Sequence, residues 1–200
     1  MLKLKGRKNE NGLENKNVYV FIDAGNLWDI YKAKKKLLDF KKLKKYLEKK
    51  FQANKLKIYY YTSYPKPDSR RDDTGGQHAF YTFLEKNLGF KVVKKPLKQI
   101  KTINNNKEII KEKGNMDVEI TIDVVDSINC FDIAILFSGD SDFLELANYI
   151  KKRNKKIYIY SSKNSVSTEL KYGGDGYKDL LEIKEIWGNE LVYKKKTALN

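Results

Sequence analysis

Short apolar runs alternate along this chain with stretches whose hydrophobic residues recur at helical spacing, and this alternation limits the fold more than any other feature. The runs lie at residues 17–22, 56–62, 90–94, 132–137 and 156–160. A continuous apolar run is typical of a parallel strand that helices cover on both faces. The alternation therefore predicts an α/β fold, a three-layer α/β/α sandwich with a mainly parallel central sheet and a Rossmann-like topology.

Helical patterns follow most of these runs. We expect helices from about Asn26, from Asp39, over 77–88, over 115–129, from Ser141 and near 166–170. Asp39 is a good N-cap, and the residues that share the apolar face of its helix are Phe40, Leu43, Leu47 and Phe51. Within 115–129, the residues at helical spacing include Val118, Ile122 and Val125.

The length of 200 residues matches a single domain. We expect a basic flexible tail over 1–16, the folded domain over 17–186 and a C-terminal tail over 187–200. Residues 95–114 are polar and include an asparagine run, which predicts a poorly ordered insertion. The segment 183–186 predicts an edge strand or a last turn.

The charge of the chain is strongly positive, with 41 Lys and Arg against 26 Asp and Glu and a net charge of +15. Such an excess favours a polyanionic partner, either nucleic acid or an anionic membrane, although a lysine-rich proteome gives the same bias. The single cysteine cannot form an internal disulfide, and no apolar run approaches the roughly 18 residues that span a bilayer. We expect a cytoplasmic protein with no membrane partner.

Four aspartates occupy positions that this topology brings together. Asp23 follows the first strand, and Asp140 and Asp142 follow the strand at 132–137. Ligands of open parallel sheets bind beyond the carboxyl ends of the strands, so these acids belong to one edge if the two strands are neighbours. The helix that begins near Asp117 precedes the second strand and runs antiparallel to it. Its N-terminus therefore lies over the same edge.

Each of these carboxylates also has a structural interpretation. Asp140 and Asp142 could cap the helix from Ser141 or favour its dipole, and Asp117 could do the same for its own helix. Asp23 differs, because a carboxylate that ends an apolar strand needs a partner. Carboxylates held together raise one another's pKa or recruit a cation, and their hard oxygen atoms suit Mg²⁺ or Mn²⁺.

Other site types find little support in the sequence. No Cys/His cluster indicates zinc, and neither a Walker loop nor a Gly-x-Gly-x-x-Gly motif is present. The single histidine, His78, lies within the helical pattern 77–88 and fits a packed or surface role better than a catalytic one.

Three segments resemble the signature motifs of NYN domains, which belong to the PIN-like nuclease superfamily. They are Phe21-Ile-Asp23-Ala-Gly-Asn26-Leu27, Lys113-Gly-Asn-Met-Asp117-Val118 with Asp123, and Phe137-Ser-Gly-Asp140-Ser-Asp142-Phe143. The resemblance runs from about Val18 to about Glu182. It implies a PIN-like α/β/α fold and metal-dependent cleavage of RNA.

The resemblance also implies roles for individual residues. The acids that would bind Mg²⁺ or Mn²⁺ are Asp23, Asp117, Asp140 and Asp142. Asn26 would support the site or touch substrate. Asp123 is a further candidate ligand, although helix geometry places it about 240° around the helix from Asp117.

Candidates for contact with nucleic acid are Lys34, Lys35, Tyr64, Arg70, Arg71, Lys98 and Lys113. Tyr64 is the candidate for stacking on a base, although aromatic residues are more often part of a core. Lys113 could steady developing charge on a phosphate, and an exposed loop lysine explains it equally well. The lysine runs over 39–50 are typical of a solvated helix face.

The expected function is that of an Mg²⁺- or Mn²⁺-dependent endoribonuclease acting on single-stranded or structured RNA. Two alternatives stay open. One is a catalytically silent RNA-binding module of the same fold, and the other is a nuclease that acts on DNA, since nothing in the sequence indicates recognition of the 2′-hydroxyl. The sequence also leaves a homodimer open.

Overall fold

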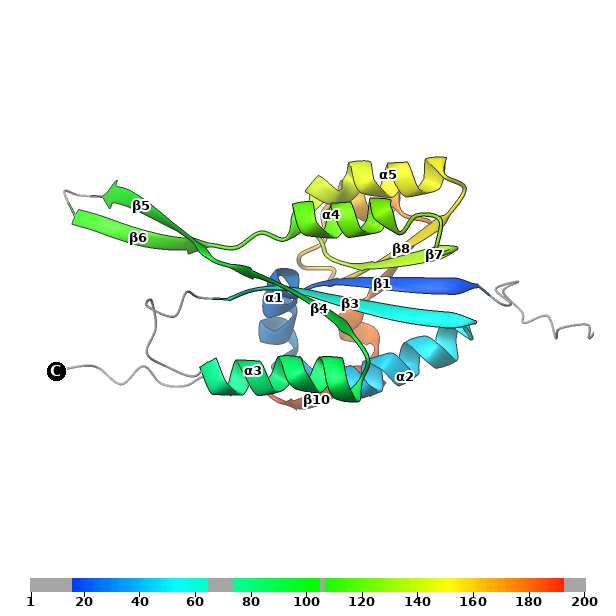
Figure 1. Ribbon diagram of the computed structural model, residues 1–200, viewed down its shortest axis with the longest axis horizontal. Helices are drawn as coiled ribbons and strands as arrows, with labels where there is room; N and C mark the ends of the chain where they lie inside the picture. Colours follow the sequence, from blue (N-terminus) through cyan, green and yellow to red (C-terminus); the bar gives the residue numbers. More distant parts are fainter. Residues whose placement is uncertain (1–15, 65–73, 105–106, 193–200) are drawn as a thin grey trace, which may run out of the picture.

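The computed structural model describes residues 16–64, 74–104 and 107–192 (Figure 1). Most of the expected N-terminal tail and the end of the expected C-terminal tail lie outside the described residues. Within the described part of the chain, one sheet contains six parallel strands in the order β4-β3-β1-β7-β8-β9. These strands are β1 (Asn17–Asp23), β3 (Lys55–Tyr64), β4 (Lys91–Pro96), β7 (Ile133–Phe137), β8 (Lys156–Ser161) and β9 (Gly176–Asp179). The predicted α/β fold with a mainly parallel sheet is confirmed.

The order of the strands reverses at the centre of the sheet. From β1 the chain builds outward through β3 to β4, and it then returns to the other side of β1 and builds outward through β7, β8 and β9. β1 and β7 are direct neighbours, with Ile22 paired to Phe137 near their carboxyl ends. In open α/β sheets this switch point leaves a crevice where ligands bind.

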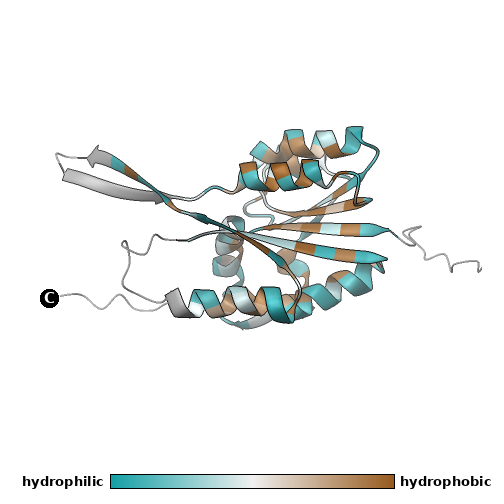
Figure 2. Cartoon of the chain, viewed as in Figure 1, coloured by the Kyte–Doolittle hydropathy of each residue, from teal (hydrophilic) through white to brown (hydrophobic). Residues whose placement is uncertain are grey.

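Helices cover both faces of the sheet (Figure 1). One face carries α1 (Ala24–Lys34), α2 (Phe40–Phe51) and α3 (Thr74–Thr82), which continues into a π-helical turn (Phe83–Asn87). The other face carries α4 (Asp117–Asp126), α5 (Leu144–Lys152) and α6 (Thr168–Gly173). Alternate residues of β1 enter the two cores, with Val20 in one and Phe21 in the other. The brown bands of Figure 2 mark these apolar residues along the strands and helices.

The predicted packing face of α2 is confirmed. In α4, the apolar residues whose spacing predicted the helix are not the residues that pack against the sheet. Asp39 caps α2 by accepting a hydrogen bond from the Lys42 amide at 3.0 Å, and the residues expected to pack (Phe40, Leu43, Leu47 and Phe51) are buried. In α4 the buried residues are Ile120 and Val124. Val118, Ile122 and Val125, whose spacing indicated the helix, are exposed.

The expectation of a poorly ordered insertion over 95–114 is wrong. β4 continues to Pro96, and β5 (Lys98–Asn104) then pairs with β6 (Lys107–Lys113) in an antiparallel hairpin. The hairpin projects away from the sheet, and β6 leads directly into α4 (Figure 1). β-Branched residues compatible with strands, Ile100, Thr102 and Ile103, interrupt the polar sequence.

The C-terminal part adds elements that the sequence pattern did not indicate. The edge strand of the sheet is β9, and the segment 183–186 contains a 3-10 turn, Lys184–Ile186, which is the turn of the two expected alternatives. Beyond residue 186, where we expected the tail to begin, β10 (Trp187–Glu190) pairs with β2 (Lys36–Leu38).

Two further observations concern the cysteine and membrane contact. The single cysteine, Cys130, is exposed. None of the helices in the described ranges is both long and apolar enough to span a bilayer.

Candidate metal centre

Three carboxylates meet beside the switch point of the sheet. One oxygen from each of Asp117, Asp140 and Asp142 lies within 4.8 Å of the others. Asp117 is the first residue of α4, whereas Asp140 and Asp142 belong to the turn that follows β7. Two of the three are half-buried and Asp142 is exposed, so the group opens to solvent. The predicted convergence of the helix start and the strand end therefore occurs.

Short polar contacts fix the turn that carries Asp140. Its side chain caps the 3-10 turn Ser141–Phe143 by accepting from the Asp142 amide at 3.0 Å, and its own amide donates to the Ser138 hydroxyl at 3.3 Å. Gly139 packs so closely against Ser165 that a side chain there would collide with backbone. These contacts hold the carboxylate of Asp140 at the mouth of the crevice.

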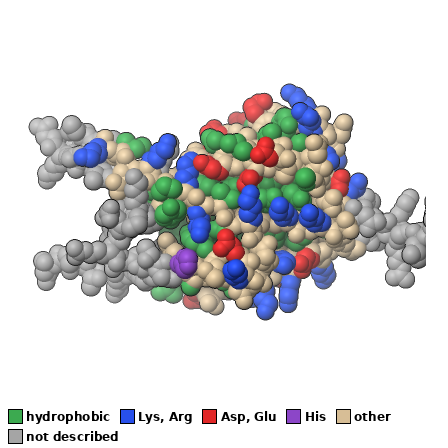
Figure 3. Space-filling model, viewed as in Figure 1, with side chains coloured by type: hydrophobic (Ala, Val, Ile, Leu, Met, Phe, Trp, Pro, Cys, Tyr) green, Lys and Arg blue, Asp and Glu red, His purple; other side chains and the backbone are tan. Residues whose placement is uncertain are grey.

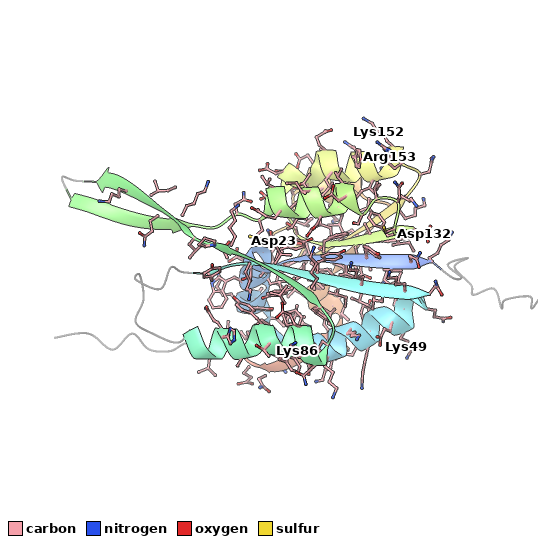
Figure 4. The ribbon with its side chains drawn as sticks, viewed as in Figure 1. Asp23, Lys49, Lys86, Asp132, Lys152 and Arg153 are labelled. Atoms are coloured by element: carbon pink, nitrogen blue, oxygen red, sulfur yellow. The ribbon has the colours of Figure 1, made fainter. Side chains whose placement is uncertain are left out.

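Asp23 is not among these three carboxylates, and it lies at the end of β1 where α1 begins (Figure 4). Its carboxylate is buried and accepts from the Gly25 amide at 3.0 Å and from the Asn26 side-chain amide at 2.6 Å. Asn26 in turn accepts from the Gly139 amide at 3.1 Å. Asn26 thus ties the end of β1 to the turn after β7.

The electrostatics of the site disfavour the charged forms of Asp117 and Asp23. Burial raises the pKa of Asp117, and the negative charges of Asp140 and Asp142 raise it further, against a hydrogen bond from Asn115 that lowers it. Burial also raises the pKa of Asp23, to which the charge of Asp117 adds. Among the residues whose side chains are described, no lysine or arginine forms an ion pair with Asp117, Asp140 or Asp142. Clustered hard oxygen ligands without a protein cation fit a divalent metal ion such as Mg²⁺ or Mn²⁺.

Asp123, the further candidate, is engaged elsewhere. It accepts a hydrogen bond from the Tyr61 hydroxyl at 2.9 Å and pairs with the Lys91 ammonium at 3.2 Å. It is not among the three carboxylates that converge at the start of the same helix. The helical turn angle between positions 117 and 123 separates the two carboxylates, as the sequence indicated.

A groove of about 560 Å³ runs past the acidic group toward the hairpin. The residues that line it are Lys95, Pro96, Lys98, Ile100, Gly114, Asn115, Asp117, Val118 and Asp142. Lys98, a predicted contact, is exposed at this groove, and Tyr64 is half-buried at the end of β3, with its carbonyl accepting from the Leu97 amide at 2.8 Å. Gly114 packs against Ser63, one residue before Tyr64.

Sequence reasoning missed two contributors to this groove. Lys95 pairs with Glu119 at 2.6 Å, and Asn115 accepts from the Asp117 amide at 2.7 Å. The Asn115 contact had a visible signal, because an asparagine just before a helix start is a common cap. Lys95 had none, since its position depends on the path of β4.

Two of the remaining predicted contacts, Lys34 and Lys35, lie away from the acidic group. Lys34 and Lys35 lie at the far end of the 11-residue helix α1, about 16 Å along its axis from Asp23. There Lys34 donates to the Leu181 carbonyl at 2.9 Å and lies over the Trp187 ring. Arg70 and Arg71 lie outside the described residues, as does the side chain of Lys113, which ends β6.

Comparisons with known proteins agree with this architecture. The model of the NYN domain family matches residues 17–181, which include all four aspartates. The chain is similar to the low amplitude and bright protein LabA of Synechococcus elongatus, with 26% identity over 165 residues that cover 82% of this chain and 84% of that protein. It also shares the fold of a protein of unknown function, VPA0982 of Vibrio parahaemolyticus. That structure has a TM-score of 0.67 and 22% identity, and the match covers 87% of this chain and 97% of that one.

Proposed function

Because this chain belongs to the NYN domain family of the PIN-like nuclease superfamily, we propose that it is a metal-dependent endoribonuclease that hydrolyses phosphodiester bonds of cytoplasmic RNA. The observation that carries this proposal is the group of three carboxylates within 4.8 Å at the switch point of the sheet. A group of negative charges that pairs with none of the described lysine and arginine side chains is costly unless a cation joins it.

Asp117, Asp140 and Asp142 would hold Mg²⁺ or Mn²⁺ through their carboxylate oxygens. Bound there, the metal would polarise a phosphate and lower the pKa of a water molecule. The choice of hard cations follows from the ligand chemistry, since the converging ligand atoms are carboxylate oxygens.

Asp23 and Asn26 would support this group of carboxylates without belonging to it. Asp23 adds negative charge near Asp117, and Asn26 holds it by the 2.6 Å hydrogen bond while binding the Gly139 amide on its other side. The side chain of Asn26 therefore sets the spacing between the two strand ends that bear the acids. A shift of either end would change the separation of the ligand oxygens.

The groove beside the acids supplies surfaces for both parts of a nucleotide. Lys95 and Lys98 offer positive charge for phosphate oxygens, while Ile100 and Val118 are exposed apolar side chains that a base can contact. Val118 is directly adjacent to Asp117 in α4. An RNA strand in this groove would bring a phosphodiester next to the carboxylates.

Cleavage of end-labelled single-stranded RNA with Mg²⁺, Mn²⁺ or EDTA tests the proposal. The wild type should cleave only with a metal present, and Asp140→Asn should be inactive. Asparagine can still cap the turn, so this variant should fold. Asp126→Asn is the matched control, because Asp126 is an exposed acid at the opposite end of α4.

Equal cleavage by the wild type and Asp140→Asn would overturn the assignment of the site. Binding of RNA without Mn²⁺ binding or turnover would favour the silent RNA-binding module instead. A DNA strand of the same sequence, assayed in parallel, separates a ribonuclease from a nuclease that acts on DNA.

A further inference from the structure

The hairpin of β5 and β6, called here the arm, lies in the chain between β4 and the helix α4 that begins at Asp117. It leaves the sheet just after β4 and returns to the start of α4, so only residues 114–116 separate β6 from Asp117. Its strands have seven residues each, which gives an arm about 23 Å long. The arm projects beyond the body of the protein, where the other described elements do not pack on it (Figure 1).

The register of the hairpin separates its charges onto two faces. Directly paired residues share a face, and alternate residues along a strand take opposite faces. One face, called here the basic face, contains positions 98, 100, 102 and 104 of β5 and their partners 113, 111, 109 and 107 of β6. The sequence has lysine at positions 98, 107, 111 and 113 of this face and no acidic residue. The opposite face has Lys101 with Glu108 and Glu112.

The basic face is the one that continues from the groove. Lys98 and Ile100, both on that face, line the groove together with Asp117 and Asp142. Gln99 and Lys101, on the opposite face, do not line it. A strand of nucleic acid that lies in the groove therefore meets the basic face as it passes outward.

This distribution of charge works against the hairpin itself. Lys98 and Lys113 are paired directly across the two strands, and like charges in that arrangement are destabilising. On the opposite face, position 101 is diagonal in the register to positions 108 and 112, which are glutamates. Lysines at successive positions on one face of a projecting ribbon are suited to contact with a polyanion.

We propose that the basic face of the β5–β6 hairpin binds the phosphate backbone of the RNA substrate outside the cleavage site and so makes binding depend on substrate length. The inference rests on the proposed function, because it extends the same groove. The partner that fits this surface is single-stranded RNA, since the groove at the base of the arm combines exposed apolar side chains for bases with lysines for phosphates.

The test compares two double variants of equal charge change. Lys107→Gln with Lys111→Gln removes charge from the outer basic face. Lys101→Gln with Lys152→Gln removes one charge from the opposite face and one from the end of α5, far from the arm (Figure 4). The affinity of the full chain for RNAs of about 4 and about 16 nucleotides is measured with EDTA present, over a series of salt concentrations.

The wild type should bind the longer RNA more tightly than the shorter one. The basic-face variant should bind the longer RNA about tenfold more weakly, and its salt slope should fall by about 0.7 for each phosphate that lysine no longer neutralises. The control variant should stay within about twofold of the wild type in its affinity for the longer RNA, and its salt slope should stay close to that of the wild type. The basic-face variant should also be at least as stable to denaturant as the wild type, which a structural role for these lysines would not give.

Equal affinities of the two double variants for the longer RNA would overturn the inference, whether both are weakened or neither is. That outcome is distinct from failure of the nuclease proposal. A protein that binds through the basic face but cleaves nothing with Mn²⁺ supports the inference and removes the activity. A protein that cleaves RNA while the two variants behave alike retains the activity and removes the inference.

Discussion

Asp117 and Asp123 lie on one helix, and their surroundings are opposite in kind. Asp117 starts α4 beside two other carboxylates, and their negative charges add to the effect of burial in raising its pKa. Asp123, six residues later, accepts a hydrogen bond from Tyr61 and pairs with Lys91. Lysine also lies over the neighbouring Tyr59 ring, with Lys57 at 4.9 Å and Lys91 at 5.1 Å.

The different surroundings of the two aspartates distinguish a candidate binding residue, Asp117, from a residue in a structural contact, Asp123. The protein itself compensates the charge of Asp123, whereas it places further negative charge beside Asp117. Figure 3 shows that lysine and arginine side chains are abundant on this face of the molecule. The cluster at Asp117 could hold a metal ion, and under the proposed function a cation from solution supplies the compensating charge.

The largest expected effect is on cleavage. Asp117→Asn should lower the rate of metal-dependent RNA cleavage by at least about a hundredfold, because even supporting residues of metal sites cost about 10- to 100-fold when changed. Asp123→Asn should stay within about threefold of the wild type, since its side-chain oxygen can still accept from Tyr61. Initial rates with Mn²⁺ measure both. Similar losses of cleavage in the two variants would contradict the conclusion that Asp117 and Asp123 have different roles.

The next effect is on stability with metal. Mn²⁺ at a hundredfold excess over its Kd should raise the free energy of unfolding of the wild type by about 2.7 kcal/mol. Asp123→Ala should respond by the same amount from a lower starting stability, whereas Asp117→Asn should lose the response. Urea unfolding with Mn²⁺ and with EDTA gives the two values for each variant. A full Mn²⁺ response in Asp117→Asn would show that the ion binds elsewhere.

Alkaline pH should lower the stability of the protein through the hydrogen bond between Tyr61 and Asp123. Burial, together with the nearby Asp123 charge, raises the pKa of the Tyr61 hydroxyl above its ordinary 10.0. The unfolded chain then loses this proton before the folded protein does, so the stabilising contribution is complete below pH 10.0 and is lost as the pH rises toward the folded-state pKa.

Stability should therefore fall above pH 10.0 by up to about 1.4 kcal/mol per pH unit for this group. Tyr61→Phe should show a shallower fall, although other buried tyrosines such as Tyr60 still contribute. Unfolding free energies across this pH range test the expectation. Identical slopes in the two proteins would contradict it.

The smallest effect concerns the exposed partner of the ion pair. Lys91→Gln should cost only about 0.5 kcal/mol, because the Lys91 side chain is 51% exposed and salt screens such pairs. The loss should shrink at high salt, and cleavage should be unchanged. Denaturant unfolding at two ionic strengths measures it. A cost that is independent of salt would show that packing of the lysine stem over Tyr59, rather than charge, is responsible.

Much of this fold follows from local pattern. The five predicted strands form, and the Asp39 cap and the packed face of α2 lie where the residue spacing indicated. The errors share a cause. The exposed Val118, Ile122 and Val125 have the same spacing as a buried face, and only the placement of α4 on the sheet decides which of its faces packs. The hairpin over 98–113 was missed because its largely polar sequence has no continuous apolar run to mark a strand.

The sequence by itself determined that acids follow two strands and start one helix, and that these strands belong to a parallel sheet. The pairing of β1 with β7, and with it the meeting of Asp117, Asp140 and Asp142, was decided by the tertiary structure, because strand order depends on long-range packing. The same holds for Asp123, whose pairing with Tyr61 and Lys91 depends on β3 and β4 passing beside α4. Residue types can be read from the chain, but the different surroundings of Asp117 and Asp123 come from residues distant in sequence.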